Sequence, residues 1–106
     1  MYEFEVDASR LVGAEVARLR QLSLGEARSL PEVSASDVVI AQKAASLTVF
    51  RYSGRDVPDD HVLVVVLAAR PQFFGTASRH LERGLVFTPV RAVRDATATE
   101  LENSGG

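Results

Sequence analysis

Cysteine is absent from this sequence. The chain therefore has no disulfide framework, no thiolate metal site and no cysteine nucleophile. Lysine occurs once, as Lys43, so arginine supplies the other eleven of the twelve basic residues. Apolar runs are short as well, and none approaches the roughly 18–20 residues of a membrane-spanning helix. Without disulfides, thiolate metal sites or membrane-spanning helices, the chain is expected to be a globular domain that is stabilised by its own hydrophobic core.

The remaining composition is that of an ordinary globular protein. The chain has 106 residues, of which 46% are hydrophobic and 25% charged, enough for one domain with its own core. The net charge of −2 argues against a general nucleic-acid coat. The first residues are acidic where a signal peptide is basic, so we expect a cytoplasmic setting. We predict a single domain over residues 1–102 and a flexible tail over 103–106.

The longest apolar run, His61 to Ala69, predicts the central strand. Its three consecutive valines are stiff at χ1 and favour a pleated backbone. The run has no alternating polar face, which is typical of a strand covered on both sides. We therefore expect the rest of the chain to pack against it.

Before this strand, the pattern predicts a strand, two helices and a second strand. Residues 2–6 alternate apolar and acidic side chains, which predicts a strand, and Asp7 could then cap a helix over residues 8–22 that stops near Gly25. Residues 25–36 carry loop residues, and Ser34 or Ser36 could cap the next segment. Residues 37–46 mix β-branched residues with alanines, and we interpret them as a helix. Residues 47–52 alternate as a strand, and 53–60 predict the turn to the central strand.

After the central strand, residues 76–83 predict a short helix stopped by Gly84, and 85–87 a short strand. Thr88 and Pro89 are typical of a helix start, since threonine caps and proline fits the first turn. That helix would end near residue 102. The expected fold is α+β, a small and mainly antiparallel sheet packed against two or three helices.

Two groups of side chains could carry chemistry. Asp59, Asp60 and His61 could bind a divalent cation, but a polar turn before a strand has the same composition. His80 and Glu82 could form a general acid–base pair, although no nucleophile-elbow pattern flanks any serine. We expect no metal, no cofactor and no catalytic residue, so the chain is interpreted as a protein that is not an enzyme.

Arginines gather in residues 70–94, where five of them meet only Glu82. They could face phosphate, pair with acidic residues of a neighbouring subunit, or form a solvated surface. Residues 1–50 carry five basic and seven acidic residues, which could form the complementary patch. Two adjacent aromatics near Gly75 could fold back into the core or insert into a partner. The subunit-interface hypothesis comprises Phe73, Phe74, Arg79, Arg83, Arg91 and Arg94.

The order of features resembles the tail-completion, or head–tail joining, proteins of the neck of long-tailed bacteriophages. The matching stretches cover most of the chain as an order of elements, and their motifs are short. They are Phe4–Asp7, Val62–Val66, Phe74–Thr76 and Phe87–Pro89, the last leading into the final helix.

This resemblance implies a structural protein of the virion, assembled in the host cytoplasm. Its partners would be copies of itself in a ring and other head or tail proteins, with no direct nucleic-acid contact and no membrane. An alternative is a small bacterial interaction module, such as an adaptor, antitoxin or immunity protein. A small enzyme or ligand-binding domain with a pocket near His61 and His80 is a further alternative.

Overall fold

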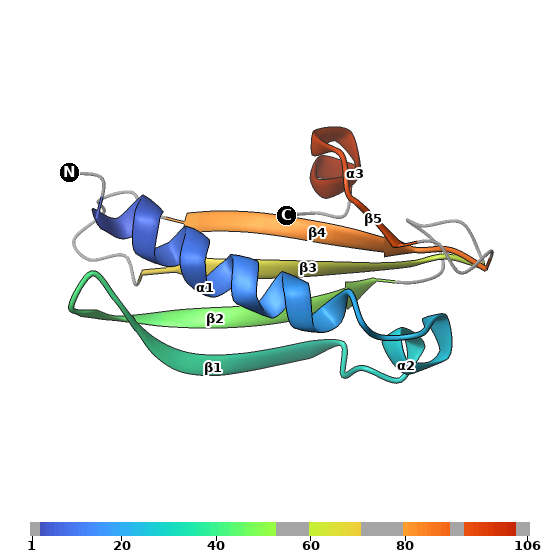
Figure 1. The fold of residues 1–106 in the computed structure, drawn as a ribbon, viewed down its shortest axis with the longest axis horizontal. Helices are drawn as coiled ribbons and strands as arrows, with labels where there is room; N and C mark the ends of the chain where they lie inside the picture. Colours follow the sequence, from blue (N-terminus) through green and yellow to red (C-terminus); the bar gives the residue numbers. More distant parts are fainter. Residues whose placement is uncertain (1–2, 53–59, 71–79, 90–92, 104–106) are drawn as a thin grey trace.

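The protein is an α+β domain, as the sequence predicts, and its described residues form a five-stranded antiparallel sheet and three helices. The computed structural model describes residues 3–52, 60–70, 80–89 and 93–103 (Figure 1). The elements are α1 (Glu3–Leu19), α2 (Leu24–Arg28), β1 (Val33–Ile40), β2 (Lys43–Tyr52), β3 (Val62–Ala69), β4 (His80–Phe87), β5 (Val93–Asp95) and α3 (Ala98–Asn103).

The strands form a meander in which each strand pairs with the next along the chain. The order across the sheet is β1-β2-β3-β4-β5, and every pairing is antiparallel. Helix α1 crosses the face of the sheet that is turned toward the viewer in Figure 1, and β1 is the lowest strand of that view. Along the described stretches, every helix is too short or too polar to cross a lipid bilayer.

The predicted central strand is confirmed as β3. Its position in the sheet explains why the apolar run has no polar face. Side chains alternate between the two faces of a strand. Val62, Val64 and Val66 lie in the core that α1 covers, whereas Leu63 and Val65 lie in a second cluster on the other face. All five are at most 4% exposed, so both faces of β3 are buried.

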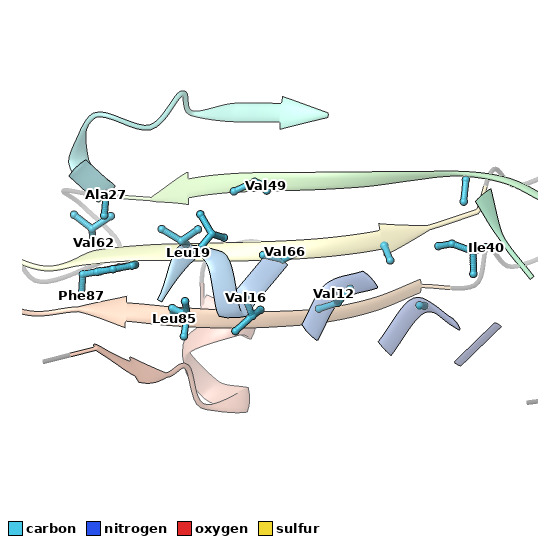
Figure 2. Packing of buried hydrophobic residues seen from close by; sticks show 14 of the residues in the cluster. Val12, Val16, Leu19, Ala27, Ile40, Val49, Val62, Val66, Leu85 and Phe87 are labelled. Carbon is cyan, nitrogen blue, oxygen red and sulfur yellow. The ribbon is translucent and has the colours of Figure 1, made fainter. Parts of the chain in front are cut away.

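The main core lies between α1 and the sheet (Figure 2). Five buried residues of α1 recur every three or four positions and form one stripe, as an amphipathic helix requires: Phe4, Ala8, Val12, Val16 and Leu19. In Figure 2 the side chains of Val12, Val16 and Leu19 lie over β3 and β4, whose Val66, Leu85 and Phe87 belong to the same cluster. Each fully buried aliphatic or aromatic side chain contributes about 1.5–3 kcal/mol to folding.

The opposite face of the sheet, called the open face below, has a smaller cluster. Leu63, Val65 and Val86 are its buried members, with Phe50 and Tyr52 packed against them at half-buried positions. Two residues near the end of the chain also pack on this cluster: Ala96, which precedes α3, and Leu101, which belongs to α3. Helix α3 has only six residues and lies at the β4–β5 side of the sheet, so it covers part of this face (Figure 1).

The predicted opening strand is wrong, because Glu3 to Val6 form the first turn of α1. Phe4 is 2% exposed and extends the apolar stripe of the helix backward by one turn, which outweighs the local alternation. Asp7 therefore lies inside the helix and is not its cap. The helix also ends at Leu19, three residues before the predicted end at 22, and Gly25 belongs to α2.

The predicted helix over residues 37–46 is wrong as well. These residues form the end of β1, a two-residue turn at Ala41 and Gln42, and the start of β2. The predicted loop over 25–36 contains most of α2 and the start of β1, so Ser34 and Ser36 are strand residues and cap nothing. The predicted strand over 47–52 is confirmed as the second half of β2, paired antiparallel with β3.

Two predictions near the end of the chain are also corrected. His80 to Arg83, the described part of the predicted helix over 76–83, form the first half of β4, where pairing with β3 overrides local propensity. No helix starts at Thr88 and Pro89. Instead β5 pairs with β4, and α3 begins after Thr97 and extends to Asn103. The predicted strand over 85–87 is confirmed within β4. Residues 53–59 of the predicted turn and 104–106 of the predicted tail lie outside the described residues.

Candidate assembly surfaces

The first candidate surface is the outer edge of β1. Among the described residues, β2 is the one strand that pairs with β1. Residues 33–37 and Val39 are exposed, and Val33 and Val39 are 58% and 63% exposed, which makes them two of the three exposed large hydrophobic residues of the described chain. An exposed edge with apolar side chains is a template for pairing with another chain.

The second candidate surface is the part of the open face that lies between α3 and β1. The pairing register places Val33 beside Phe50, Phe50 beside Val65, and Val65 beside Gly84. Residues directly opposite each other in adjacent strands share a face, so these residues form one apolar row across four strands. The rings of Phe50 and Tyr52 stack beside it, with centroids 6.2 Å apart and 25° between their planes.

The β1–β2 turn is held by a carboxylate of α1. Ala41 and Gln42 have φ angles of 51° and 66°, the left-handed region that costs most residues free energy. The N–H of Ala41 donates to Asp7 Oδ2 at 2.8 Å, and Arg10 Nη2 donates to Asp7 Oδ1 at 2.6 Å. The hydrogen bond from Ala41, and then that from Arg10, lowers the pKa of Asp7 below its ordinary value. Asp7 therefore links the start of α1 to the tip of the hairpin.

A shallow hollow lies around this link. It opens between the first turns of α1 and the β1–β2 turn, and its described lining residues are Glu3, Val6, Asp7, Arg10, Ala41 and Gln42. A second hollow lies where the α1–α2 connection meets the end of β4, and its lining includes Leu22, Ser23 and Phe87. Neither hollow contains a histidine among its described lining residues.

Arg70, at the end of β3, makes its described contacts inside the domain. Its guanidinium lies over the ring of Phe4, 5.0 Å from the centroid, and its Nη2 donates to the Ile40 carbonyl at 2.9 Å. The contact with Phe4 has the geometry of a cation–π interaction. Arg70 therefore ties the end of β3 to α1 and to the end of β1.

Arg83 and Arg94 also meet acidic residues of their own chain. Asp95 Oδ1 lies 2.6 Å from Arg20 Nη2 and 3.8 Å from Arg83 Nη2. Arg94 forms a bidentate pair with Glu100, at 2.8 and 2.7 Å. Arg83 pairs across the strands with Val66 on the α1 face, whereas Arg94 pairs with Val86 on the open face. The two arginines therefore point to opposite faces and do not form one patch.

Glu100 has a second role as part of the N-terminal cap of α3. Thr97 Oγ1 accepts from the Glu100 N–H at 3.2 Å, and Glu100 Oε1 accepts from the Thr97 N–H at 2.8 Å. This reciprocal arrangement is a capping box. The Arg94 hydrogen bonds, and then the Thr97 N–H, lower the pKa of Glu100 to about 2, although partial burial acts in the opposite direction.

Four of the six predicted interface residues lie outside the described residues: Phe73, Phe74, Arg79 and Arg91. The two that are described are Arg83 and Arg94, whose neighbours are given above. The hypothesis that these side chains contact a neighbouring subunit stays a prediction. Sequence reasoning missed Val33 and Val39, although the β-branched valines of residues 33–39, separated by short side chains, were a signal of a strand.

The two histidines lie at opposite ends of β3. His61 precedes Val62, and its Nδ1 lies 2.7 Å from Asp60 Oδ1, a contact that lowers the pKa of Asp60. His80 pairs with Ala69 at the other end. At about 3.3 Å per residue, roughly 25 Å separates the histidines. One small pocket could not hold both.

Within the described residues, neither the candidate acid–base pair nor the candidate metal group gains further polar side chains that would complete a site. His80 and Glu82 lie two residues apart on β4, beside Ala69 and Leu67 on the open face. Asp59, the third member of the possible metal group, lies outside the described residues. No three His, Asp or Glu side chains gather as a metal site in residues 3–52, 60–70, 80–89 and 93–103.

Over the described residues, these features define an antiparallel α+β domain with a helix-covered face, a partly open face and an exposed edge along β1. No protein-family model, curated protein or solved structure matches this chain. Its function is therefore inferred from its surfaces.

Proposed function

We propose that the chain is a structural protein of the bacteriophage neck or tail, a ring-forming subunit that completes the tail or joins it to the head. The observation that supports this most is the apolar row from Val33 to Gly84, which runs from a partly covered face to an exposed edge. Val65 and Gly84 are buried in this row, Phe50 is half-buried, and Val33 at its outer end is exposed. Exposed apolar surface at a sheet edge marks a site of protein association. The resemblance of the order of elements to that of the neck proteins is the reason for placing this association in the phage neck or tail.

The structure changes that resemblance in two places. Its opening stretch, Phe4–Asp7, is helical, and Phe87–Pro89 leads into β5 before the last helix. The stretch Val62–Val66 is an extended strand, as the resemblance implies. The proposal therefore rests more on the surfaces than on the order of elements.

Native mass spectrometry and negative-stain microscopy of the purified chain test this proposal. We expect closed rings of one copy number, alone or on mixing with tail or capsid proteins encoded by neighbouring genes. A Val33→Ser variant provides a contact test, since it removes an exposed apolar group without a core partner. A chain that forms no ring with any such partner, or whose neighbouring genes encode no portal or tail protein, contradicts the proposal.

The exposed edge also favours a second candidate, a protein–protein interaction module. An extended peptide can add a strand to an exposed sheet edge through main-chain hydrogen bonds. A heterologous partner that protects β1 amides from hydrogen exchange, in the absence of rings, would favour this candidate.

A further inference from the structure

We propose that β1 is an interface between two copies of this chain, which pair antiparallel about a two-fold axis at Ser36. The paired strands would join the two five-stranded sheets into one. This inference rests on strand register and on no phage role, so it is tested independently of the proposed function. A ring would need a second, different contact in addition, because a two-fold contact closes on itself.

The first argument is the direction of the backbone groups. The Arg51 N–H donates to the Glu32 carbonyl at 3.0 Å, so the backbone groups of residue 32 point toward β2. In an antiparallel pair, residues whose N–H and C=O point toward the partner alternate with residues whose groups point away. The residues of β1 with outward groups are therefore Val33, Ala35, Asp37 and Val39.

The hairpin geometry gives the same assignment independently. The two-residue turn at Ala41 and Gln42 is closed by Ile40 and Lys43, which face each other. The closing pair of such a turn is hydrogen-bonded, so residue 40 points its groups toward β2 and residue 39 points them outward. Both arguments leave the same four residues with backbone donors and acceptors at the edge.

The second argument is that one register satisfies all four residues. With the two-fold axis at Ser36, Val33 faces Val39 of the second copy, and Ala35 faces Asp37 of the second copy. Each outward residue then meets another outward residue, as a hydrogen-bonded antiparallel pair requires. The two exposed valines meet each other, and no like charges are opposed.

The neighbouring registers are worse for definite reasons. An axis at Ala35 places Val39 opposite Pro31, which has no N–H to donate. An axis at Asp37 places the two Asp37 carboxylates directly opposite each other, where like charges are destabilising. Of these three registers, the one with the axis at Ser36 makes the edge complementary to itself.

The third argument is continuity with the apolar row of the open face. Val33 is the last residue of that row and is 58% exposed. In the proposed register, Val39 of the second copy lies beside it and continues the row into the second sheet. On the α1 face Ser34 would face Val38 and Ser36 would face Ser36 of the second copy. The small serine side chains leave room for the strands to approach.

An alternative role for Asp37 is to prevent edge-to-edge pairing by its charge. Natural proteins place charged side chains on edge strands for that purpose. In the proposed register Asp37 faces Ala35 and stays at the solvent-exposed surface, so it opposes only the wrong register. If Asp37 instead prevents pairing, the wild-type chain is a monomer and Asp37→Ala creates association.

Single cysteines test the register directly, because the natural chain has none. In Ser36→Cys the two cysteines face each other in a non-hydrogen-bonded pair, about 4.5 Å apart at Cα, within disulfide range. In the matched control Ser34→Cys, each cysteine lies four residues, or about 13 Å, from its copy. We expect rapid disulfide dimers of Ser36→Cys and at least tenfold fewer of Ser34→Cys under mild oxidation.

Two further measurements separate pairing from folding. Ala35→Pro removes an outward N–H and no bond to β2, so we expect a folded protein whose dimer is weakened at least tenfold in analytical ultracentrifugation. Hydrogen exchange should slow at high concentration at the amides of Val33, Ala35, Asp37 and Val39. Amides of Ser34 and Ser36, bonded to β2, should be protected at every concentration.

Three outcomes overturn the inference. They are a wild-type monomer at about 1 mM, equal cross-linking of Ser36→Cys and Ser34→Cys, and protection of β1 that requires a heterologous peptide. Dimers without any virion association would contradict the proposed function alone. Rings in which Ser36→Cys does not cross-link would contradict this inference alone.

Discussion

The carboxylate of Asp7 accepts a hydrogen bond from the backbone N–H of Ala41 across 34 positions of sequence, at 2.8 Å. This bond joins the second turn of α1 to a hairpin tip whose two residues both have positive φ. It therefore explains how a turn without glycine or asparagine is held in place.

Removing this carboxylate should loosen the hairpin. Asp7→Ala leaves the N–H of Ala41 without its acceptor, and we expect a lower Tm and faster exchange of the Ala41 amide. Arg10→Ala removes only an exposed ion pair and serves as the control, with an effect of about 0–1 kcal/mol. Equal losses in the two variants would show that the ion pair, and not the turn, explains the effect.

Replacing the turn residues should stabilise the protein. Asn and Gly tolerate positive φ, so we expect the double variant Ala41→Asn, Gln42→Gly to raise the free energy of unfolding by about 1–2 kcal/mol. Urea denaturation measures this change. The control Ala44→Gly, in the adjacent strand, should lower stability by about 0.5–1 kcal/mol. A loss of stability in the double variant would contradict the left-handed turn.

Gly84 should tolerate no side chain. A Cβ at this position would lie 2.9 Å from Ala96 Cβ, 2.9 Å from Leu101 Cδ2 and 3.3 Å from the Val64 carbonyl oxygen. We expect Gly84→Ala to displace α3 and to lower the free energy of unfolding by about 1–3 kcal/mol, as overpacking does.

Gly13 provides the matched control for this substitution. Apart from the adjacent residues and the backbone of its own helix, no described heavy atom lies within 4 Å of a Cβ built there, in the interior of α1. Gly13→Ala should therefore stabilise the protein by up to about 1 kcal/mol through helix propensity. Thermal denaturation of both variants should show opposite signs, and a common sign would contradict the close packing of α3 on β4.

Glu100 should make stability depend on pH in the acid range. Its pKa is about 2 in the folded protein and 4.5 as an ordinary glutamate, so the unfolded chain binds the proton more readily. Its contribution is present above pH 4.5 and is lost as the pH falls toward 2. The Glu100–Arg94 pair is partly exposed, at 32% and 50%, so we expect only about 1 kcal/mol.

The Glu100→Gln variant tests this contribution. Its stability deficit relative to the natural chain should be largest near pH 7 and should shrink between pH 4.5 and 2. Chemical denaturation at several pH values measures the difference. A deficit that does not change with pH would assign the role of Glu100 to the capping of α3 and not to its charge.

Much of the central architecture could be predicted from the sequence. The valine run specifies β3 because β-branched side chains favour a strand and because two apolar faces require cover on both sides. Most of α1 follows from the spacing of Val12, Val16 and Leu19. The missed capping boxes, Ser23 with Glu26 and Thr97 with Glu100, were also present as local patterns and would have located the starts of α2 and α3.

Other parts depended on contacts that the local sequence does not contain. Phe4 is helical because it completes a stripe that packs on the sheet, although Tyr2 to Val6 alternate as a strand would. The β1–β2 turn lacks the usual turn residues, since Asp7 supplies a stabilising bond from a distant position. The predicted arginine patch depended on which way β4 and β5 face, and the register places Arg83 and Arg94 on opposite sides.

By itself the sequence determined that the core contains a strand rich in β-branched residues, that an amphipathic helix packs on it, and that the fold is α+β. These features follow from hydrophobic periodicity, which is a local property of the chain. Only the tertiary structure decided that residues 37–46 form a hairpin, that β1 lies at an edge of the sheet, and which residues of β1 face outward. Those properties depend on pairing between distant segments, because a shift of one residue in register exchanges the two faces of a strand.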